Sequence, residues 1–408
     1  MTEWPTMTLR DAGVALIDCV HKTPPAVEVG YPYVTIPQMK NGRIDFAGAR
    51  RITHADFIEW TKKARPQVHD VVLSRRTNPG VTATFGEICD FALGQNLVLL
   101  RANGSLVCPE FLRWLVVSPA WWSQIEKYNN VGAVFDSLKC ADVPRFELPI
   151  PPKREQRAIA SILGALDDKI DLNRRMNETL EAMARAIFKD WFLRRSHEFS
   201  RCPVSDLIAG GIMKIGDGYR AKNDEMGSPG LPFIRAGELN NGFDTQGADV
   251  LHERSVMAAR DKLSQAGDVA FTSKGTIGRF ARVTAQTPQF VYSPQVCFWR
   301  SSDPSRLRPA ILYLWMVGND LASQIDAAAG QTDMAPYVSL RDQRAMKMPV
   351  FDESQHAVAD MVEPLLSLQD ANLAETRTLT ATRDLLLPKL LSGEIRVKDA
   401  EKIAEAAA

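Results

Sequence analysis

The sequence has little that marks a secreted, metal-binding or membrane protein. Its six cysteines include no C-x-x-C pair, which predicts free thiols in a reducing cytosol rather than a disulfide framework or a structural zinc site. Its six histidines form no H-E-x-x-H motif, so we expect no metal ligand set. No run approaches the roughly 18 to 20 apolar residues that span a bilayer, and the first 20 residues lack the basic flank of a signal peptide. We therefore expect a cytoplasmic protein with no membrane partner.

Motifs for catalysis are also missing. There is no G-x-x-x-x-G-K-[ST] loop of an ATP-driven motor and no G-x-S-x-G nucleophile elbow. The residues Asn78-Pro79-Gly80 are similar to the start of an amino-methyltransferase loop, but its second proline and its aromatic residue are absent, so a turn is expected. The glycine-rich stretch 210–218 has no strand before it and no helix after it, which predicts a loop and no cofactor site. The chain is typical of a binding protein with no catalytic residues.

Neither sign of charge is in excess. Lys plus Arg and Asp plus Glu each total 49 in 408 residues, so any contact with DNA must come from local basic loops. The chain is 45% hydrophobic, and its length predicts two to three domains with cores of their own.

The chain repeats itself at an offset of about 200 residues. Four segments recur in the same order, which is hard to obtain by chance and indicates two similar modules in tandem. The paired segments are 31–45 with 231–244, 69–76 with 267–274, 134–138 with 336–340, and 155–160 with 354–359.

The first part of each module mixes short strand-like runs with turn signals and short helices. Val71-Val72-Leu73 and the segments 96–100 and 296–299 are expected as strands, and 109–117 and 309–317 as helices. Strands and helices do not alternate as in a doubly wound fold, so we predict an α+β class with a largely antiparallel sheet.

The second part of each module is expected to be one long helix. Residues Lys153 to Arg195 contain no proline and one glycine, and apolar or asparagine residues recur at alternating four and three spacing, as in a coiled coil. These are Ile159, Leu163, Leu166, Ile170, Asn173, Asn177, Leu180, Ala184, Ile187 and Trp191.

The second copy, Ser354 to Leu391, repeats the spacing with Pro364 inside it, where we expect a bend. Such helices cannot bury their stripes alone, so we expect them to pack together, antiparallel if a pseudo-twofold axis relates the modules. The alternative is that each helix packs only on its own globular part. The expected seam residues are Val358, Met361, Leu365, Leu368, Asn372, Glu375, Leu379, Thr382 and Leu386.

The segments 148–159, 166–182 and 186–192 together strongly resemble the central conserved region of the specificity (S) subunits of Type I restriction-modification systems. Residues 385–395 look like the distal conserved region of that family, and 268–279 is similar to a segment common in its target recognition domains. The first module departs from the family at Ser74 to Pro79, where a Ser-Gly-Thr-Ile-Gly-like loop is usual.

The resemblance implies two target recognition domains separated by two long conserved helices that form an antiparallel coiled coil. The implied boundaries are 1–152 for target recognition domain 1, 153–198 for the central helix, 199–350 for target recognition domain 2, 351–396 for the distal helix and 397–408 for a C-terminal tail. Each domain of such a subunit reads one half of a bipartite site in double-stranded DNA. The subunit itself is not an enzyme and carries no cofactor.

The resemblance also implies protein partners. Such subunits bind methyltransferase (M) subunits, two in number, which methylate adenine, and restriction (R) subunits that translocate and cleave DNA. The basic surface near Arg174, Arg175 and Lys189 is a candidate contact for the methyltransferase.

Base readout needs donors and acceptors on loops, with Arg suited to guanine and Asn or Gln to adenine, while Lys, Ser and Thr hold phosphates. Because the repeat aligns two such loops, we expect them to contact DNA, with Gln38, Lys40 and Arg235 as weaker candidates. The predicted DNA-binding residues are Arg75, Arg76, Thr77, Asn78, Ser273, Lys274, Thr276 and Arg279.

Two other functions remain open at this point. One is a helical scaffold that binds proteins and no DNA, which would show no salt-sensitive, sequence-dependent DNA binding. The other is a DNA methyltransferase or nuclease whose motifs are too degenerate to recognise.

Overall fold

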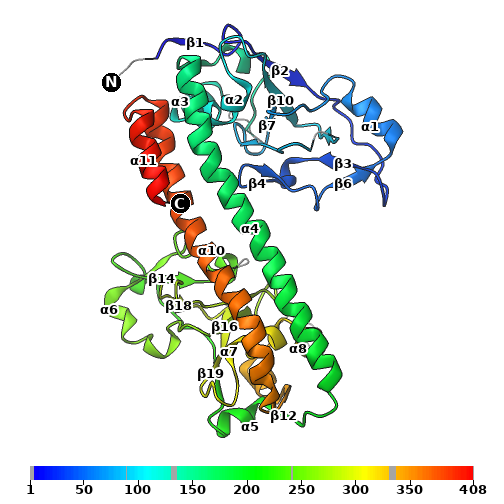
Figure 1. Cartoon of the computed structure of the whole chain (residues 1–408), viewed down its shortest axis with the longest axis vertical. Helices are drawn as coiled ribbons and strands as arrows, with labels where there is room; N and C mark the ends of the chain where they lie inside the picture. Colours follow the sequence, from blue (N-terminus) through cyan, green and yellow to red (C-terminus); the bar gives the residue numbers. More distant parts are fainter. Residues whose placement is uncertain (1–3, 89, 130–135, 240–241, 330–336, 408) are drawn as a thin grey trace. The chain divides into compact units, whose positions relative to one another are not determined.

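The computed structural model describes residues 4–88, 90–129, 136–239, 242–329 and 337–407. Several of the repeat residues lie outside this part of the chain, namely Val134, Phe135, Asn240, Asn241 and Pro336. The chain forms two compact units, residues 1–171 with 375–408 and residues 172–374 (Figure 1). The division falls within the two long helices, so each unit contains a segment of both.

Unit 1 is built from short strands and helices that precede the first long helix. Its strands are β1 (Thr6–Thr8), β2 (Val14–Asp18), β3 (Tyr31–Val34), β4 (Met39–Lys40), β5 (Arg43–Ile44), β6 (Arg50–Ile52), β7 (Val71–Ser74), β8 (Thr82–Ala83), β9 (Ala92–Leu93), β10 (Leu97–Ala102) and β11 (Glu147–Pro149). Its helices are η1 (Ile36–Gln38), α1 (His54–Thr61), α2 (Pro109–Leu115), α3 (Pro119–Tyr128) and η2 (Val143–Arg145), followed by the start of α4 (Lys153–Arg195), the end of α10 (Ser354–Leu391) and α11 (Val397–Ala407).

Unit 2 repeats this order. Its strands are β12 (Arg201–Pro203), β13 (Met213–Gly216), β14 (Gly230–Ile234), β15 (Val250–His252), β16 (Val269–Thr272), β17 (Phe280–Arg282), β18 (Val291–Tyr292), β19 (Val296–Ser301) and β20 (Lys347–Pro349). Its helices are α5 (Val204–Ala209), η3 (Asn223–Glu225), η4 (Ala236–Glu238), α6 (Glu253–Val256), η5 (Arg260–Lys262), α7 (Pro309–Met316), α8 (Asn319–Ala329) and α9 (Leu340–Ala345), beside the end of α4 and the start of α10.

The sheets of the two units have the same topology, as the repeat predicts. Unit 1 has a four-stranded sheet in the order β2-β10-β7-β8, and unit 2 has β13-β19-β16-β17. In a second sheet, β3 pairs antiparallel with β6 and parallel with β9, and β14 pairs in the same two ways with β15 and β18. The strand β13 lies in the stretch 210–218, where a loop was predicted. That prediction was wrong because Ile215 and its neighbours pair with the central strand β19.

One buried ion pair holds each four-stranded sheet at the same place. Arg101 on β10 donates to Asp70 at 2.8 and 2.6 Å, and Arg300 on β19 donates to Asp268. Both arginines also donate to a backbone carbonyl, and both aspartates accept a backbone N–H three residues upstream. The repeat therefore extends to individual polar contacts in the cores.

Each globular part is joined to a long helix through a buried glutamine. The Gln156 amide in unit 1 accepts from the Cys108 backbone at 2.7 Å and donates to the carbonyls of Leu106 and Pro151. In unit 2 the Gln355 amide accepts from the Arg308 backbone at 3.0 Å and donates to Arg306 and Asp352. Because Gln156 of α4 and Gln355 of α10 make equivalent hydrogen bonds, equivalent residues of the two helices are 199 positions apart in the sequence.

The predicted bounds of the long helices are confirmed. The helix α4 has 43 residues and α10 has 38, and α10 continues through Pro364. Within each unit the two helices lie side by side. In unit 2 Asn372 donates to Asn177 at 2.9 Å and Gln369 donates to Glu181 at 3.2 Å. The two helices therefore run antiparallel within this unit. In unit 1 Arg383 pairs with Asp167 at 2.8 Å.

The predicted seam of α4 is buried or half-buried throughout, whereas two seam predictions in α10 are wrong. Met361 and Leu368 are 60% and 45% exposed. The buried face there shifts to Val362 and Leu366, because those residues pack into the core of unit 2.

The residues that were expected as a C-terminal tail form the helix α11 over most of their length. Val397, Ala400 and Ala404 share one face of this helix and pack against the core of unit 1, where Ala400 is fully buried. Among the described residues, no helix is both long and apolar enough to cross a lipid bilayer.

Candidate nucleic-acid interface

The two predicted loops are equivalent hairpin turns. After β7 the Ser74 N–H donates to Val81 at 2.8 Å and Gly80 donates back to Ser74 at 3.0 Å. After β16 the Thr272 N–H donates to Arg279 at 3.0 Å and Gly278 donates back to Thr272 at 3.2 Å. The sequence offset of 198 therefore matches residue for residue in these turns.

A residue with positive φ sits at the same position in both turns. Thr77 has φ +66° and its counterpart Gly275 has φ +76°. A β-branched residue rarely adopts this conformation, which glycine adopts without strain. The first loop thus keeps the fold of the second while presenting a side chain where the second has none.

In the first loop, three of the four predicted residues are exposed, namely Arg76, Thr77 and Asn78. Arg75 is half-buried, and its backbone is tied on both sides, donating to Asn96 and accepting from Leu138, each at 2.9 Å. Its Nε atom is buried and has no acceptor among the described residues. Arg75 therefore lies under the loop, and the exposed donors are those of the next three residues.

In the second loop, Thr276 and Arg279 are exposed. Lys274 is half-buried, with its Nζ atom 4.5 Å from the centre of the Tyr337 ring. Ser273 is 1% exposed, and its backbone N–H donates to Gln295 at 2.9 Å. In each loop the first residue, Arg75 or Ser273, is at least half-buried, and residues further along the loop face solvent.

The structure adds amide side chains that the sequence analysis missed. Asn96 and Gln295 each precede the central strand of a four-stranded sheet, and their backbone carbonyls accept from the first residue of the neighbouring loop. The Gln295 side chain also accepts from the Ala236 N–H at 3.2 Å, while the Arg279 guanidinium donates to the Ala236 carbonyl at 3.3 Å. An offset of 199 between two amide residues was the signal in the sequence that could have identified them.

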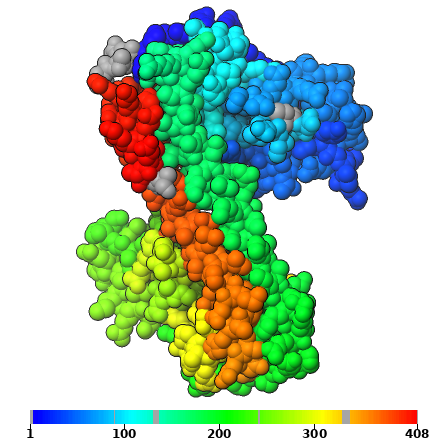
Figure 2. All heavy atoms as spheres, viewed as in Figure 1, coloured from blue at the N-terminus to red at the C-terminus, as the bar shows by residue number. Residues whose placement is uncertain are grey.

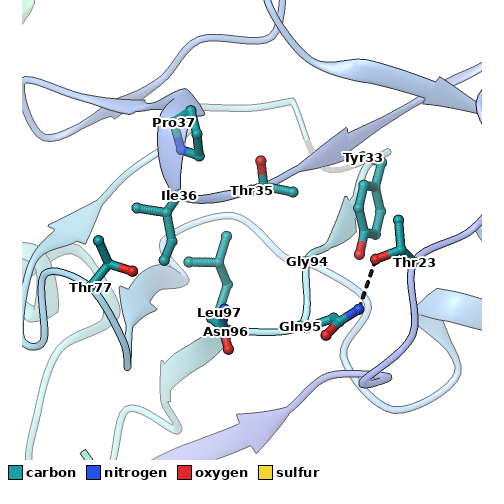
Figure 3. A pocket seen from close by; sticks show the side chains of 10 residues that line it. All are labelled: Thr23, Tyr33, Thr35, Ile36, Pro37, Thr77, Gly94, Gln95, Asn96 and Leu97. Atoms are coloured by element: carbon teal, nitrogen blue, oxygen red, sulfur yellow. Dashed lines mark hydrogen bonds between the residues drawn. The ribbon is translucent and has the colours of Figure 1, made fainter. Parts of the chain in front are cut away.

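A hollow of about 440 Å³ lies beside the first loop (Figure 3). Thr77 lies at one end of it, and Tyr33 and Thr23 lie at the other, where Gln95 donates to Thr23 at 2.7 Å. The lining mixes hydroxyl and amide groups with Ile36, Pro37 and Leu97. Such a surface offers hydrogen-bond donors and acceptors next to apolar area.

The weaker candidates are engaged within their own loops. The Gln38 amide donates to Gly48 at 3.0 Å and accepts from Thr35, and Lys40 pairs with Asp45 at 2.7 Å. Arg235 pairs with Asp249. The Asp45 carboxylate has a pKa below its ordinary value because the Lys40 ammonium donates to it.

One group of potential metal ligands comes together among the described residues, namely Asp18, Cys19 and His21. Burial raises the pKa of the Cys19 thiol to about 11, so it stays protonated, and its sulfur donates to the Gly94 carbonyl at 3.2 Å. The His21 ring is bonded to Asp18 and to Gln95, each at 2.9 Å. Hydrogen bonds join the three residues, since the Asp18 carboxylate also accepts from the Cys19 backbone N–H at 3.0 Å.

Comparisons with known proteins agree with this geometry. Residues 3–182 match the family model described as the Type I restriction modification DNA specificity domain. The chain is 25% identical over 313 residues to the Type I restriction enzyme MjaIX specificity subunit of Methanocaldococcus jannaschii, covering 72% of this chain and 70% of that protein. It is 23% identical over 402 residues to the putative MjaX specificity subunit of the same organism, covering 91% and 88%.

A solved structure with a similar fold is the S subunit of a Type I restriction-modification system from M. genitalium. The TM-score is 0.57 at 17% identity, and the match covers 96% of this chain and 99% of that chain.

Proposed function

We propose that the chain is a specificity subunit of a Type I restriction-modification system and that it reads a bipartite site in double-stranded DNA, one half with each unit. Specificity subunits are non-catalytic DNA-recognition subunits. The observation that carries the proposal is the pair of equivalent loops, 75–81 and 273–279, which have one backbone framework and different exposed side chains.

The two loops suit two different half-sites. Side chains reach base edges best from a rigid base, and each loop is tied at its base to an edge of the central strand. Arg76 and Asn78 in the first loop suit guanine and adenine, whereas Lys274, Thr276 and Arg279 in the second suit phosphates and guanine. Arg75 and Ser273 belong to the same proposed sites, where their backbone hydrogen bonds to Asn96 and Gln295 anchor the first residue of each loop.

The helices set the spacing between the half-sites. At about 1.5 Å per residue, the 43 residues of α4 correspond to a length of roughly 65 Å. We propose that α4 and α10 form one antiparallel coiled coil and that a pseudo-twofold axis relates the two target recognition domains, 1–152 and 199–350. The segments 153–198 and 351–396 then act as spacers, and unread base pairs lie between the half-sites.

The proposed partners are two methyltransferase subunits and, in a complete system, restriction subunits. The two equivalent units would offer two similar surfaces, which accounts for two methyltransferase subunits per chain. Arg174, Arg175 and Lys189 lie in the unit 2 part of α4 and are exposed, which suits a role at such a surface.

The test uses the chain assembled with its methyltransferase subunits. Arg76→Ala with Asn78→Ala is expected to relax recognition of one half-site, and Lys274→Ala with Arg279→Ala that of the other, as measured by binding to DNA with either half altered. Equal losses on both halves would contradict the modular readout. A complex without sequence-dependent, salt-sensitive binding would favour the scaffold function instead.

A further inference from the structure

The helix α11 lies beside the long helices in unit 1 (Figure 1). Residues of α4, α10 and α11 together line one groove. The groove is lined by Ile162, Ala165 and Lys169 of α4 and by Leu379 of α10. Glu401, Ala404 and Glu405 of α11 line the same groove, and Ala400 is fully buried in the core of unit 1. The space-filling view shows α11 seated against α4 in unit 1 (Figure 2).

The groove lies on the side of the helices that faces away from the sheets of unit 1. Asp167 of α4 pairs with Arg113 and Arg43 of the globular part. Ala165 and Lys169 are each two residues from Asp167, which places them about 200° around the helix. The globular part and α11 therefore occupy opposite sides of α4.

The repeat identifies the equivalent face in unit 2. Gln156 and Gln355 make equivalent hydrogen bonds at an offset of 199, and this offset carries Ile162, Ala165, Leu166 and Lys169 of α4 onto α10. The matching residues are Met361, Pro364, Leu365 and Leu368. Leu379 corresponds to Leu180 in the same way.

This face of unit 2 also points away from its globular part. Glu363 pairs with Arg308 and Asp370 with Arg282, and Met361 and Leu368 each lie two residues before one of these acids. On α4, Met183 lies two residues after Glu181, which accepts from Tyr313 of the globular part at 2.6 Å.

In the part of the chain that the structure describes, this face of unit 2 is largely exposed. Met361, Leu368 and Met183 are 60%, 45% and 47% exposed, and α4 is followed by the strand β12 where α10 is followed by α11. An exposed, flexible Met and Leu surface is typical of sites that accept an amphipathic helix. The molecule thus has two equivalent faces, one of which its own C-terminal helix already fills.

We propose that α11 is an intramolecular occupant of one of two equivalent helix-docking faces. An amphipathic helix of a partner protein then enters the open face of unit 2 first and binds unit 1 only after α11 is displaced. This inference rests on the proposed function, in which the partner is the methyltransferase subunit. The two binding steps are unequal because the second competes with α11.

The charge pattern favours a different protein over a second copy of this chain. Glu401 and Glu405 of α11 line the groove that contains Lys169, whereas unit 2 has Leu368 at that position. Lys169 pairs with Glu375 at 3.3 Å and lies in the same groove as Glu401 and Glu405, so a second copy's α11 would lose the attraction of this lysine on the face of unit 2. The favoured occupant has an apolar residue there.

The experiment measures stepwise binding of the purified methyltransferase subunit to the full chain, by native mass spectrometry and calorimetry. We expect Ala400→Glu, which expels α11, to strengthen the weaker step by about tenfold or more. The exposed control Ala406→Glu should behave as the wild type. A chain that ends at Arg396 tests the same point if Ala400→Glu disturbs unit 1.

On the other face, Met361→Glu with Leu368→Glu is expected to abolish the stronger step, while the exposed control Met257→Glu leaves it unchanged. Unchanged steps in the Ala400 and Met361 variants, or self-association of the wild-type chain through Met361 and Leu368, would overturn the proposal. Half-site DNA binding is measured in the same complexes. If the wild-type complex does not distinguish the half-sites, the proposed function is overturned. If it does distinguish them but the variants leave both methyltransferase-binding steps unaltered, only this inference is overturned.

Discussion

The loops after β7 and β16 show how one backbone framework presents two different surfaces. Their turns have the same hydrogen bonds, the same positive-φ position and the same buried base. The first carries Arg76, Thr77 and Asn78 at its tip, and the second carries Lys274, Gly275 and Thr276. The framework depends on backbone contacts that many sequences satisfy, so the exposed residues are free to differ.

The largest expected effect is on the ion pair that anchors each sheet. Asp268 is fully buried, and besides Arg300 it accepts from the Tyr292 hydroxyl at 2.9 Å, whereas the equivalent Asp70 has no such tyrosine among its described contacts. Removing one partner of a buried pair leaves an uncompensated charge, so Asp268→Ala should lower the free energy of unfolding by about 3 to 5 kcal/mol. Asp70→Ala should cost less. Urea unfolding of the two variants checks this, and a larger loss for Asp70→Ala would contradict the ranking.

The exposed loop residues should have smaller and separable effects. Asn78→Ala is expected to cost about 1 to 3 kcal/mol of discrimination at one base pair of one half-site, if it makes a bidentate contact with adenine. Thr276→Ala in the second loop should leave that half-site unchanged. Titration of half-site variants with the assembled complex gives both values. A loss at the wrong half-site would show that the loops do not act separately.

The pair of asparagines in unit 2 distinguishes its helix contact from that of unit 1. Asn177 and Asn372 are nearly buried and bonded to each other, so Asn372→Leu leaves the Asn177 amide without that donor and should cost about 1 to 3 kcal/mol. The double replacement by Leu should recover most of this loss. Thermal unfolding of the single and double variants tests the coupling, and additive losses would contradict it.

The smallest effect is expected at the positive-φ position. Thr77→Gly should stabilise unit 1 or leave it unchanged, because relief of strain of about 1 to 2 kcal/mol is offset by the greater freedom of glycine in the unfolded chain. Gly275→Ala should destabilise unit 2 by about 1 kcal/mol. Opposite signs in calorimetry would confirm that both loops need the same backbone conformation. Stabilisation by Gly275→Ala would contradict it.

Local sequence patterns predicted the long helices reliably but predicted burial incompletely. The start of α4 at Lys153 follows from Pro151 and Pro152, and its length follows from a periodic stretch without proline. Met361 and Leu368 continue the same spacing in α10 yet are exposed, since the core of unit 2 takes up Val362 and Leu366 instead. Periodicity shows that a stripe exists but not what covers it.

For the candidate interface too, the sequence predicted some features and not others. The repeat identified both loops, but it did not show that Arg75 and Ser273 lie at their bases or that Asn96 and Gln295 lie beside them. Those contacts join residues about 20 positions apart through the pairing of neighbouring strands, which composition and spacing do not report.

Local propensity and similarity along the chain are enough to show that there are two modules, where the long helices begin and end, and which loops correspond. The folded chain was needed to show which side chains of each loop face solvent, and that α11 packs against the core of unit 1 while Met361 and Leu368 of unit 2 are exposed. Exposure depends on which surfaces meet after folding, and two similar sequences bury different residues when different neighbours pack against them.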